Sequence, residues 1–106
     1  MVSDPKTPVV LANVAVTEIQ RDTQTVTITN MGLDTDISKF IILSQRGNEV
    51  FLFPEGSLLG GGQSVSISSI PGADYVWPDE SKVWHQEKDD SAFLYDRFGN
   101  FLSRRD

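Results

Sequence analysis

A run of turn residues between two apolar segments, within residues 51–67, constrains the fold of this chain more than any other feature. Pro54 ends the first segment because proline has no N–H to donate to a neighbouring strand. Three consecutive glycines at 60–62 permit positive φ angles and let the chain turn back sharply. Residues 63–69 then alternate polar and apolar side chains with a period of two, which is typical of a strand buried on one face. The stretch predicts two strands joined by a turn-rich connector.

Similar short apolar segments, separated by turn residues, recur along the chain. Strands are expected at 9–17, 25–29, 38–44, 49–53, 63–69, 91–95 and 100–103, with a further short one at 81–84. Apolar residues of both parities in 38–44 indicate a central strand. The first strand also has apolar residues of both parities, which either a bulge near Asn13 or burial of the strand on both faces would explain. No segment shows helical periodicity over ten residues. Seven or eight short strands predict an antiparallel β-sandwich.

The connections carry typical turn residues. Gly47 is expected at positive φ in the turn at 45–48. Residues 34–36 are expected to form an acidic loop, and residues 70–80, which include two prolines, the longest irregular loop. Residues 1–8 are expected to be a linker or tail that precedes a domain spanning 9–106.

The inward parity of the strands predicts a hydrophobic core. Its expected members are Val26, Ile28, Phe40, Ile42, Val65, Ile67, Ala92, Leu94 and Leu102. The same period sends Phe93, Tyr95 and Phe101 to the opposite side of a closing hairpin, where they would share one outer surface. Two interpretations stay open: cross-strand aromatic pairs that stabilise the hairpin, or a face that binds a partner.

Length and composition exclude several classes of protein. The 106 residues suffice for one domain, and the absence of cysteine excludes a disulfide scaffold and thiolate chemistry. A net charge of −6 disfavours binding to phosphate backbones, so no nucleic-acid partner is expected. No apolar run approaches the roughly 18 residues of a membrane-spanning helix, and the first residues do not resemble a signal peptide. We expect a domain excised from a larger protein.

Four segments resemble the lamin-tail domain, the immunoglobulin-like module of nuclear lamins and of many bacterial proteins. They are the strand 26–30 ending in Asn, the segment 37–42 where the family usually has Leu-x-Gly-Trp, the Phe-Pro-Glu-Gly run at 53–56 with the glycines that follow, and Val83-Trp84 with the segments 92–96 and 99–100. Lys39 and Phe40 replace the Gly and Trp of the family pattern, and residues 85–90 replace a segment that reads Asn-Asn-x-Gly-Asp in bacterial members. The third and fourth segments are closer to the bacterial members.

The resemblance implies an immunoglobulin-like antiparallel β-sandwich of about seven to nine strands. It also implies a non-catalytic interaction or scaffolding module without a cofactor. Its partner would be another protein, the rest of the parent chain or a second copy of the domain. Bacterial members are exported or at the cell surface, whereas a true lamin relative would be nuclear. Such fold analogy sets only an expectation about function.

The chain has a few other residues whose chemistry could form a site. His85, the one histidine, has no nucleophile-elbow serine to pair with, and one histidine without cysteine does not make a structural zinc site. The acidic residues Glu87, Asp89 and Asp90, with Asp79 and Glu80, lack the spacing of a calcium loop, so no metal is expected. The remaining candidates, Trp77 and Trp84, either stack on a sugar ring or pack in the sandwich. The sugar-stacking hypothesis, which would make this a carbohydrate-binding accessory module of an exported hydrolase or surface protein, requires an exposed Trp77.

Overall fold

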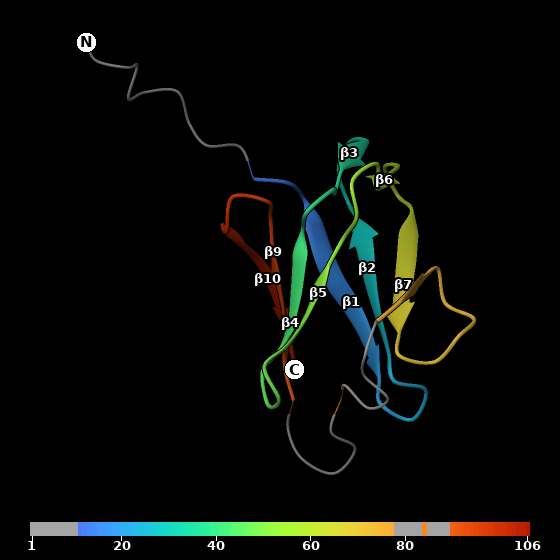
Figure 1. Ribbon diagram of the computed structural model, residues 1–106. Coiled ribbons are helices and arrows are strands. Elements are labelled where there is room, and N and C mark those ends of the chain that lie inside the picture. Colours follow the sequence, from blue (N-terminus) through green and yellow to red (C-terminus); the bar gives the residue numbers. More distant parts are fainter. Residues whose placement is uncertain (1–10, 78–83, 85–89) are drawn as a thin grey trace.

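The computed structural model describes residues 11–77, 84 and 90–106, and within them all regular structure is β (Figure 1). The strands are β1 (Val14–Gln20), β2 (Thr25–Asn30), β3 (Thr35–Asp36), β4 (Ile41–Ser44), β5 (Glu49–Leu52), β6 (Leu58–Leu59), β7 (Ser64–Ser68), β8 (Tyr75–Val76), β9 (Ala92–Tyr95) and β10 (Phe101–Arg105). The described part of the chain contains no helix that is long and apolar enough to cross a membrane.

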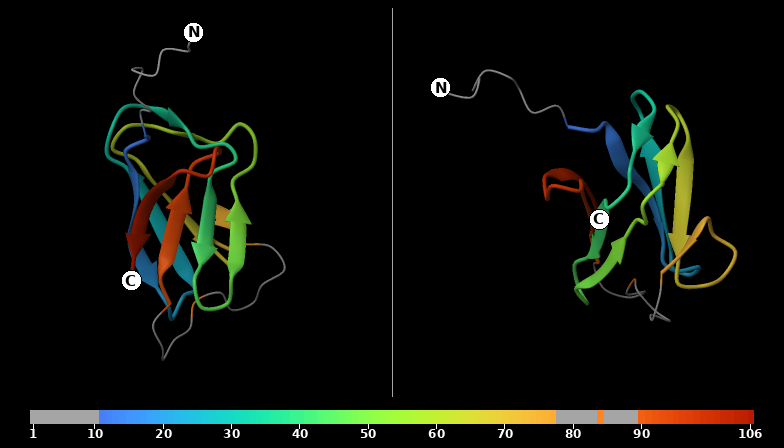
Figure 2. Two further views of the ribbon diagram at one scale, coloured as in Figure 1. Left: turned by 90° about the vertical axis from the view of Figure 1, so that its left-hand side faces the viewer. Right: turned by 45° about the horizontal axis from the view of Figure 1, so that its top comes forward.

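Two four-stranded sheets face each other across the core. One has the order β1-β2-β7-β8 and the other the order β10-β9-β4-β5, while β3 and β6 form a small separate pair at one end (Figures 1 and 2). Every pairing is antiparallel except that of β7 with β8. The expected all-β sandwich is confirmed, and β4 lies between β9 and β5 as a central strand should.

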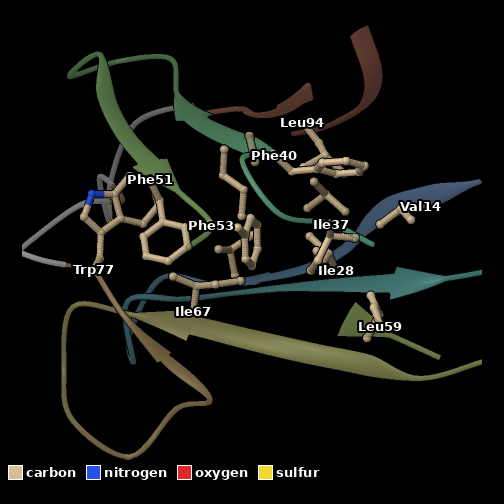
Figure 3. Close-up of a cluster of buried hydrophobic side chains, with 14 of the residues drawn as sticks. Val14, Ile28, Ile37, Phe40, Phe51, Phe53, Leu59, Ile67, Trp77 and Leu94 are labelled. Atoms are coloured by element: carbon tan, nitrogen blue, oxygen red, sulfur yellow. The ribbon is translucent and has the colours of Figure 1, made fainter. Parts of the chain in front are cut away.

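The core fills the space between the two sheets (Figure 3). Seven of the nine expected core residues are buried, namely Val26, Ile28, Phe40, Ile42, Ile67, Ala92 and Leu94. Val65 and Leu102 are only half-buried, although both pack against the core. The core also includes residues that strand parity alone did not select: Val14, Val16, Ile37, Phe51, Phe53, Leu59, Trp77 and Trp84.

Several expected boundaries were wrong. The first strand begins at Val14, and its register shift lies between Val16 and Glu18 instead of near Asn13. The strand expected from residue 38 begins at Ile41, because the chain turns just before it. The strand expected at 81–84 lies outside the described residues except for Trp84.

Two expected loops contain strands. Thr35 and Asp36 of the acidic loop pair with Leu59 and Leu58, so both the loop and the connector after Pro54 contribute to the β3–β6 pair. The long loop at 70–80 contains β8, which pairs in parallel with β7. These strands have two residues each, and so short a segment shows no measurable period.

The turn angles also differ from expectation. In the turn before β5, the residue with positive φ is Asn48 (57°) and not Gly47. Asparagine tolerates a positive φ because its side chain can form hydrogen bonds with the local backbone. In the glycine run only Gly62 has positive φ, at 81°. Lys39 adopts φ 65°, an angle that ordinarily favours glycine.

The buried side chain of Asn30 fastens the β3–β6 pair to the end of β2. Its Nδ2 donates to the carbonyl oxygens of Leu33 (2.7 Å) and Leu59 (2.9 Å), and its Oδ1 accepts from the N–H of Gly32 (2.9 Å). Asn30 is fully buried, and burying an amide without hydrogen-bond partners would destabilise the fold. Here the side-chain nitrogen and oxygen both have partners, so this cost is avoided.

A second buried amide, Gln24, pairs with the backbone of Trp84. The N–H of Trp84 donates to Gln24 Oε1 (2.7 Å), and Gln24 Nε2 donates to the carbonyl oxygens of Trp84 (2.9 Å) and Arg21 (2.6 Å). This pairing holds Trp84 against the core. Gln24 itself has a positive φ of 55°.

Candidate functional site

The sheet of β10, β9, β4 and β5 has one side that faces away from the core (Figure 2, left). All four strands place apolar residues on this outward side. Because successive side chains of a strand point to opposite faces, the residues that alternate with buried Ile42, Phe51 and Leu94 point outward. We call this surface the outer apolar face; its members are Ile41, Leu43, Val50, Leu52, Phe93, Tyr95 and Phe101.

Strand register aligns these residues in two rows across the sheet. The first row runs Leu52, Ile41, Tyr95, Phe101, and the second runs Val50, Leu43, Phe93, Arg104. The two edge strands contribute the most accessible members, since Val50 is 53% exposed, Leu52 49% and Phe101 51%. The surface is therefore continuous and accessible at both margins.

The three aromatic residues expected to share an outer surface do lie together. Phe101 packs against Tyr95 with ring centroids 6.0 Å apart, and against Phe93 at 6.4 Å. Both pairs are tilted or edge-on, the arrangements that aromatic rings favour. The grouping is consistent with either a stabilising cluster or a binding face.

The hairpin turn that presents Phe101 is fixed by Asp96. One oxygen of its carboxylate accepts hydrogen bonds from the N–H groups of Phe98 and Asn100, both at 2.9 Å, and the other accepts from the Asn100 amide. Burial disfavours the charged form of Asp96, but the hydrogen bonds from Asn100, Phe98 and Gly99 together outweigh it and lower the pKa of the carboxyl. The turn is therefore held by an ionised side chain.

A polar hollow lies at the Arg104 end of the second row. It is lined by Gln45, Arg46, Ser91, Arg104 and Asp106 and measures about 600 Å³. Asp106 places its carboxylate oxygen Oδ1 within 2.8 Å of Arg104 Nε, and the Ser91 hydroxyl donates to the same oxygen. These contacts, first from Ser91 and then from Arg104, lower the pKa of Asp106. The hollow already holds one carboxylate.

The sugar-stacking role of the two tryptophans is wrong for this structure. Trp77 is 2% exposed and Trp84 is fully buried, and their rings pack edge-on with centroids 5.9 Å apart. Trp77 also contacts Phe51 at 5.7 Å (Figure 3). Stacking on a sugar needs an accessible ring face. Both indoles are buried, so neither offers such a face. Their contribution is to the core.

The acidic and histidine candidates are only partly described. His85, Glu87, Asp89, Asp79 and Glu80 lie outside the described residues. Asp90 is buried, and its Oδ1 accepts from the Ser44 hydroxyl (2.9 Å) and the Arg46 N–H (3.0 Å). Within the described ranges no three acidic or histidine side chains come close enough together to hold a metal ion.

The sequence pattern predicts only part of the outer apolar face. The period of the closing hairpin predicts Phe93, Tyr95 and Phe101 on the outer side but does not point to Val50 and Leu52. The sequence does contain a clue to these two residues. Ile41 and Leu43 are apolar although they alternate with the buried residues of a central strand. A central strand with apolar residues on both sides predicts that its neighbours continue the outward row.

Comparison with known proteins adds no relative: no protein-family model matches the chain, and no curated protein gives a significant match.

Proposed function

We propose that this domain is a non-catalytic protein-interaction module that binds its partner through the outer apolar face. The observation that carries the proposal is an apolar row that spans all four strands of one sheet, beside a second row that is apolar over three of them. Scattered surface hydrophobes are ordinary, but a contiguous apolar surface of this kind is typical of contact sites. Aromatic residues, which are enriched in the centre of interfaces, supply three of its seven members.

We also propose that the domain is related to lamin-tail modules, for which a scaffolding role is expected. The geometry of Lys39 supports this relationship. The family pattern has Gly at this position, and Lys39 here has φ 65°, which a glycine would adopt without strain. The sequence thus departs from the pattern in residue type while the backbone keeps a conformation suited to glycine.

The competing explanation is that the aromatic cluster only stabilises the hairpin. Cross-strand aromatic pairs are worth about 0.2–1 kcal/mol each. The two pairs made by Phe101 would then contribute about 0.4–2 kcal/mol. That contribution does not explain why the rows continue over β4 and β5, where Val50 and Leu52 remain half exposed.

The double variant Phe93→Ser, Phe101→Thr tests the proposal. Peptides selected on the wild-type domain from a displayed random library, together with sedimentation velocity for self-association, would report binding through the face. We expect the double variant to lose most of this binding while its Tm falls by only a few degrees. Phe98→Ser is the matched control, because Phe98 is 82% exposed and lies in the turn outside the two rows. Wild-type and double-variant domains that bind alike would refute the proposal.

A further inference from the structure

We propose that the partner is a polypeptide segment that places one carboxylate on Arg104 and Ser91 and its neighbouring apolar side chains on the outer apolar face. This inference rests on the proposed function and specifies the chemistry of the partner. It assigns a recognition role to the polar hollow at the end of the second row.

The hollow is already built to hold a carboxylate. Ser91 is 3% exposed, so its hydroxyl is fixed by its surroundings, and it donates to Asp106 Oδ1. Arg104 Nε donates to the same oxygen at 2.8 Å, and Arg104 Nη2 donates to the Ser91 oxygen at 3.3 Å. The side chain of Asp106 is itself 73% exposed, so its carboxylate can be replaced by one from outside without unpacking the core.

The carboxylate site and the apolar surface are contiguous. Arg104 lies opposite Phe93 in the strand register, and its guanidinium carbon is 5.2 Å from the centroid of the Phe93 ring. From Phe93 the row continues over Leu43 to Val50. A segment that binds Arg104 through an Asp or Glu therefore sets its adjacent side chains on this row. Charge fixes one end of the segment, and apolar contact fixes the rest.

A second copy of the domain fits this surface less well. If the outer apolar faces of two copies meet, the Asp106 carboxylate of each copy is already engaged by its own Arg104 and Ser91. A separate segment with an acidic residue beside apolar ones brings a carboxylate of its own, which can replace that of Asp106, so this is the occupant that we infer.

The test uses a displayed library of random 12-residue peptides selected on the wild-type domain, followed by fluorescence anisotropy with synthetic copies of the selected peptides. We expect the selected peptides to carry Asp or Glu beside apolar residues. Arg104→Gln should weaken their binding about tenfold or more, the usual effect of losing a hydrogen-bonded charge. Replacing the acidic residue of the peptide by its amide should cost the same amount on the wild type and nothing further on Arg104→Gln.

Asp106→Ala is the sharper test. If Asp106 only stabilised the fold, its removal would not make the peptides bind more tightly. Removing the internal carboxylate frees the site, so we expect the peptides to bind several-fold more tightly. Arg105→Gln is the control for the loss of positive charge, since Arg105 lies opposite buried Ala92 instead of an outward residue. Asp74→Ala is the control for the loss of negative charge, since Asp74 lies beside β7 in the other sheet.

The outcomes separate this inference from the proposed function. Peptides whose binding depends on Phe93 and Phe101 but ignores Arg104→Gln would overturn the inference and leave the function standing. Self-association that the Phe93→Ser, Phe101→Thr variant abolishes would do the same, by identifying a second copy as the partner. If no selected peptide depends on Phe93 and Phe101, and no self-association does, both fail.

Discussion

Gln24 offers the most direct test of how this sandwich is held together. Its side-chain amide makes three hydrogen bonds to main-chain atoms, two of them to Trp84 and one to Arg21. Gln24→Ala leaves those three main-chain groups without this partner, in surroundings where Trp84 is fully buried. At about 1 kcal/mol for each bond, the variant should lose about 3 kcal/mol of unfolding free energy. For a domain of this size that loss lowers the Tm by more than about 10 °C.

Two further substitutions separate the hydrogen bonds from backbone strain. Gln24 has φ 55°, so Gln24→Gly should be about 1 kcal/mol more stable than Gln24→Ala while still less stable than the wild type. Gln24→Glu keeps an acceptor for the Trp84 N–H but loses the donor to the two carbonyl groups. It should cost at least as much as alanine at pH 7.

Urea denaturation followed by tryptophan fluorescence measures these differences, because both tryptophans are buried and their emission shifts when they become exposed. The midpoint and the slope of each transition give the unfolding free energy. A loss below about 1 kcal/mol for Gln24→Ala would refute the reasoning, since it would mean that the amide bonds are replaced at no cost.

Three other predictions concern the core, the backbone and pH. Ile67→Ala should lose about 2–5 kcal/mol in urea melts, because Ile67 is fully buried, whereas Ile70→Ala, at a position 48% exposed, should change stability far less; similar losses would mean that the inward face is assigned wrongly. Lys39→Gly should raise the unfolding free energy by about 0.5–1 kcal/mol by relieving the positive φ, and a decrease measured by calorimetry would show that the lysine side chain stabilises the fold. Because the pKa of Asp96 is lowered on folding, its ionised form contributes stability that is complete above about pH 5 and is lost as the pH falls through about 4 toward the folded pKa. Asp96→Asn should flatten this part of the stability profile in urea melts, and an unchanged slope between pH 6 and 3 would contradict the assignment.

Strand parity predicted the parts of the fold that depend on local alternation. Ile28 was placed correctly because its segment, Thr25–Asn30, alternates polar and apolar residues with a clear period of two. Ile42 and Leu94 were also placed correctly, although their strands carry apolar residues on both sides. The same parity placed Phe93 and Tyr95 outside. The sequence by itself therefore specifies the core side of a strand that is apolar on one side, as in β2, whereas in β4 and β9 the core side depends on contacts with other strands.

The remaining features depend on contacts between distant segments. Gln24 looks like an ordinary turn residue, yet it is buried because Trp84, 60 residues later, needs partners for its backbone. The burial of Trp77 likewise depends on Phe51 in the opposite sheet. The carboxylate site combines Ser91 with Arg104 through the register of a hairpin that shifts between Phe101 and Ser103. A register shift of this kind has no local signature in the chain.

The position of β4 has a consequence for synthesis on the ribosome. One neighbour of β4, β5, follows it immediately, but the other, β9, lies about 50 residues further along the chain. β5 ends at Leu52 and β9 ends at Tyr95. At about 5–20 residues per second, the hairpin of β4 and β5 therefore waits about 2–9 seconds for β9. During this interval the hairpin has an unpaired edge and apolar residues on both sides, which favours pairing with other nascent chains. The nascent chain is therefore prone to aggregate through the exposed apolar residues of this hairpin, Ile41, Leu43, Val50 and Leu52. We expect the yield of soluble protein to depend on the translation rate.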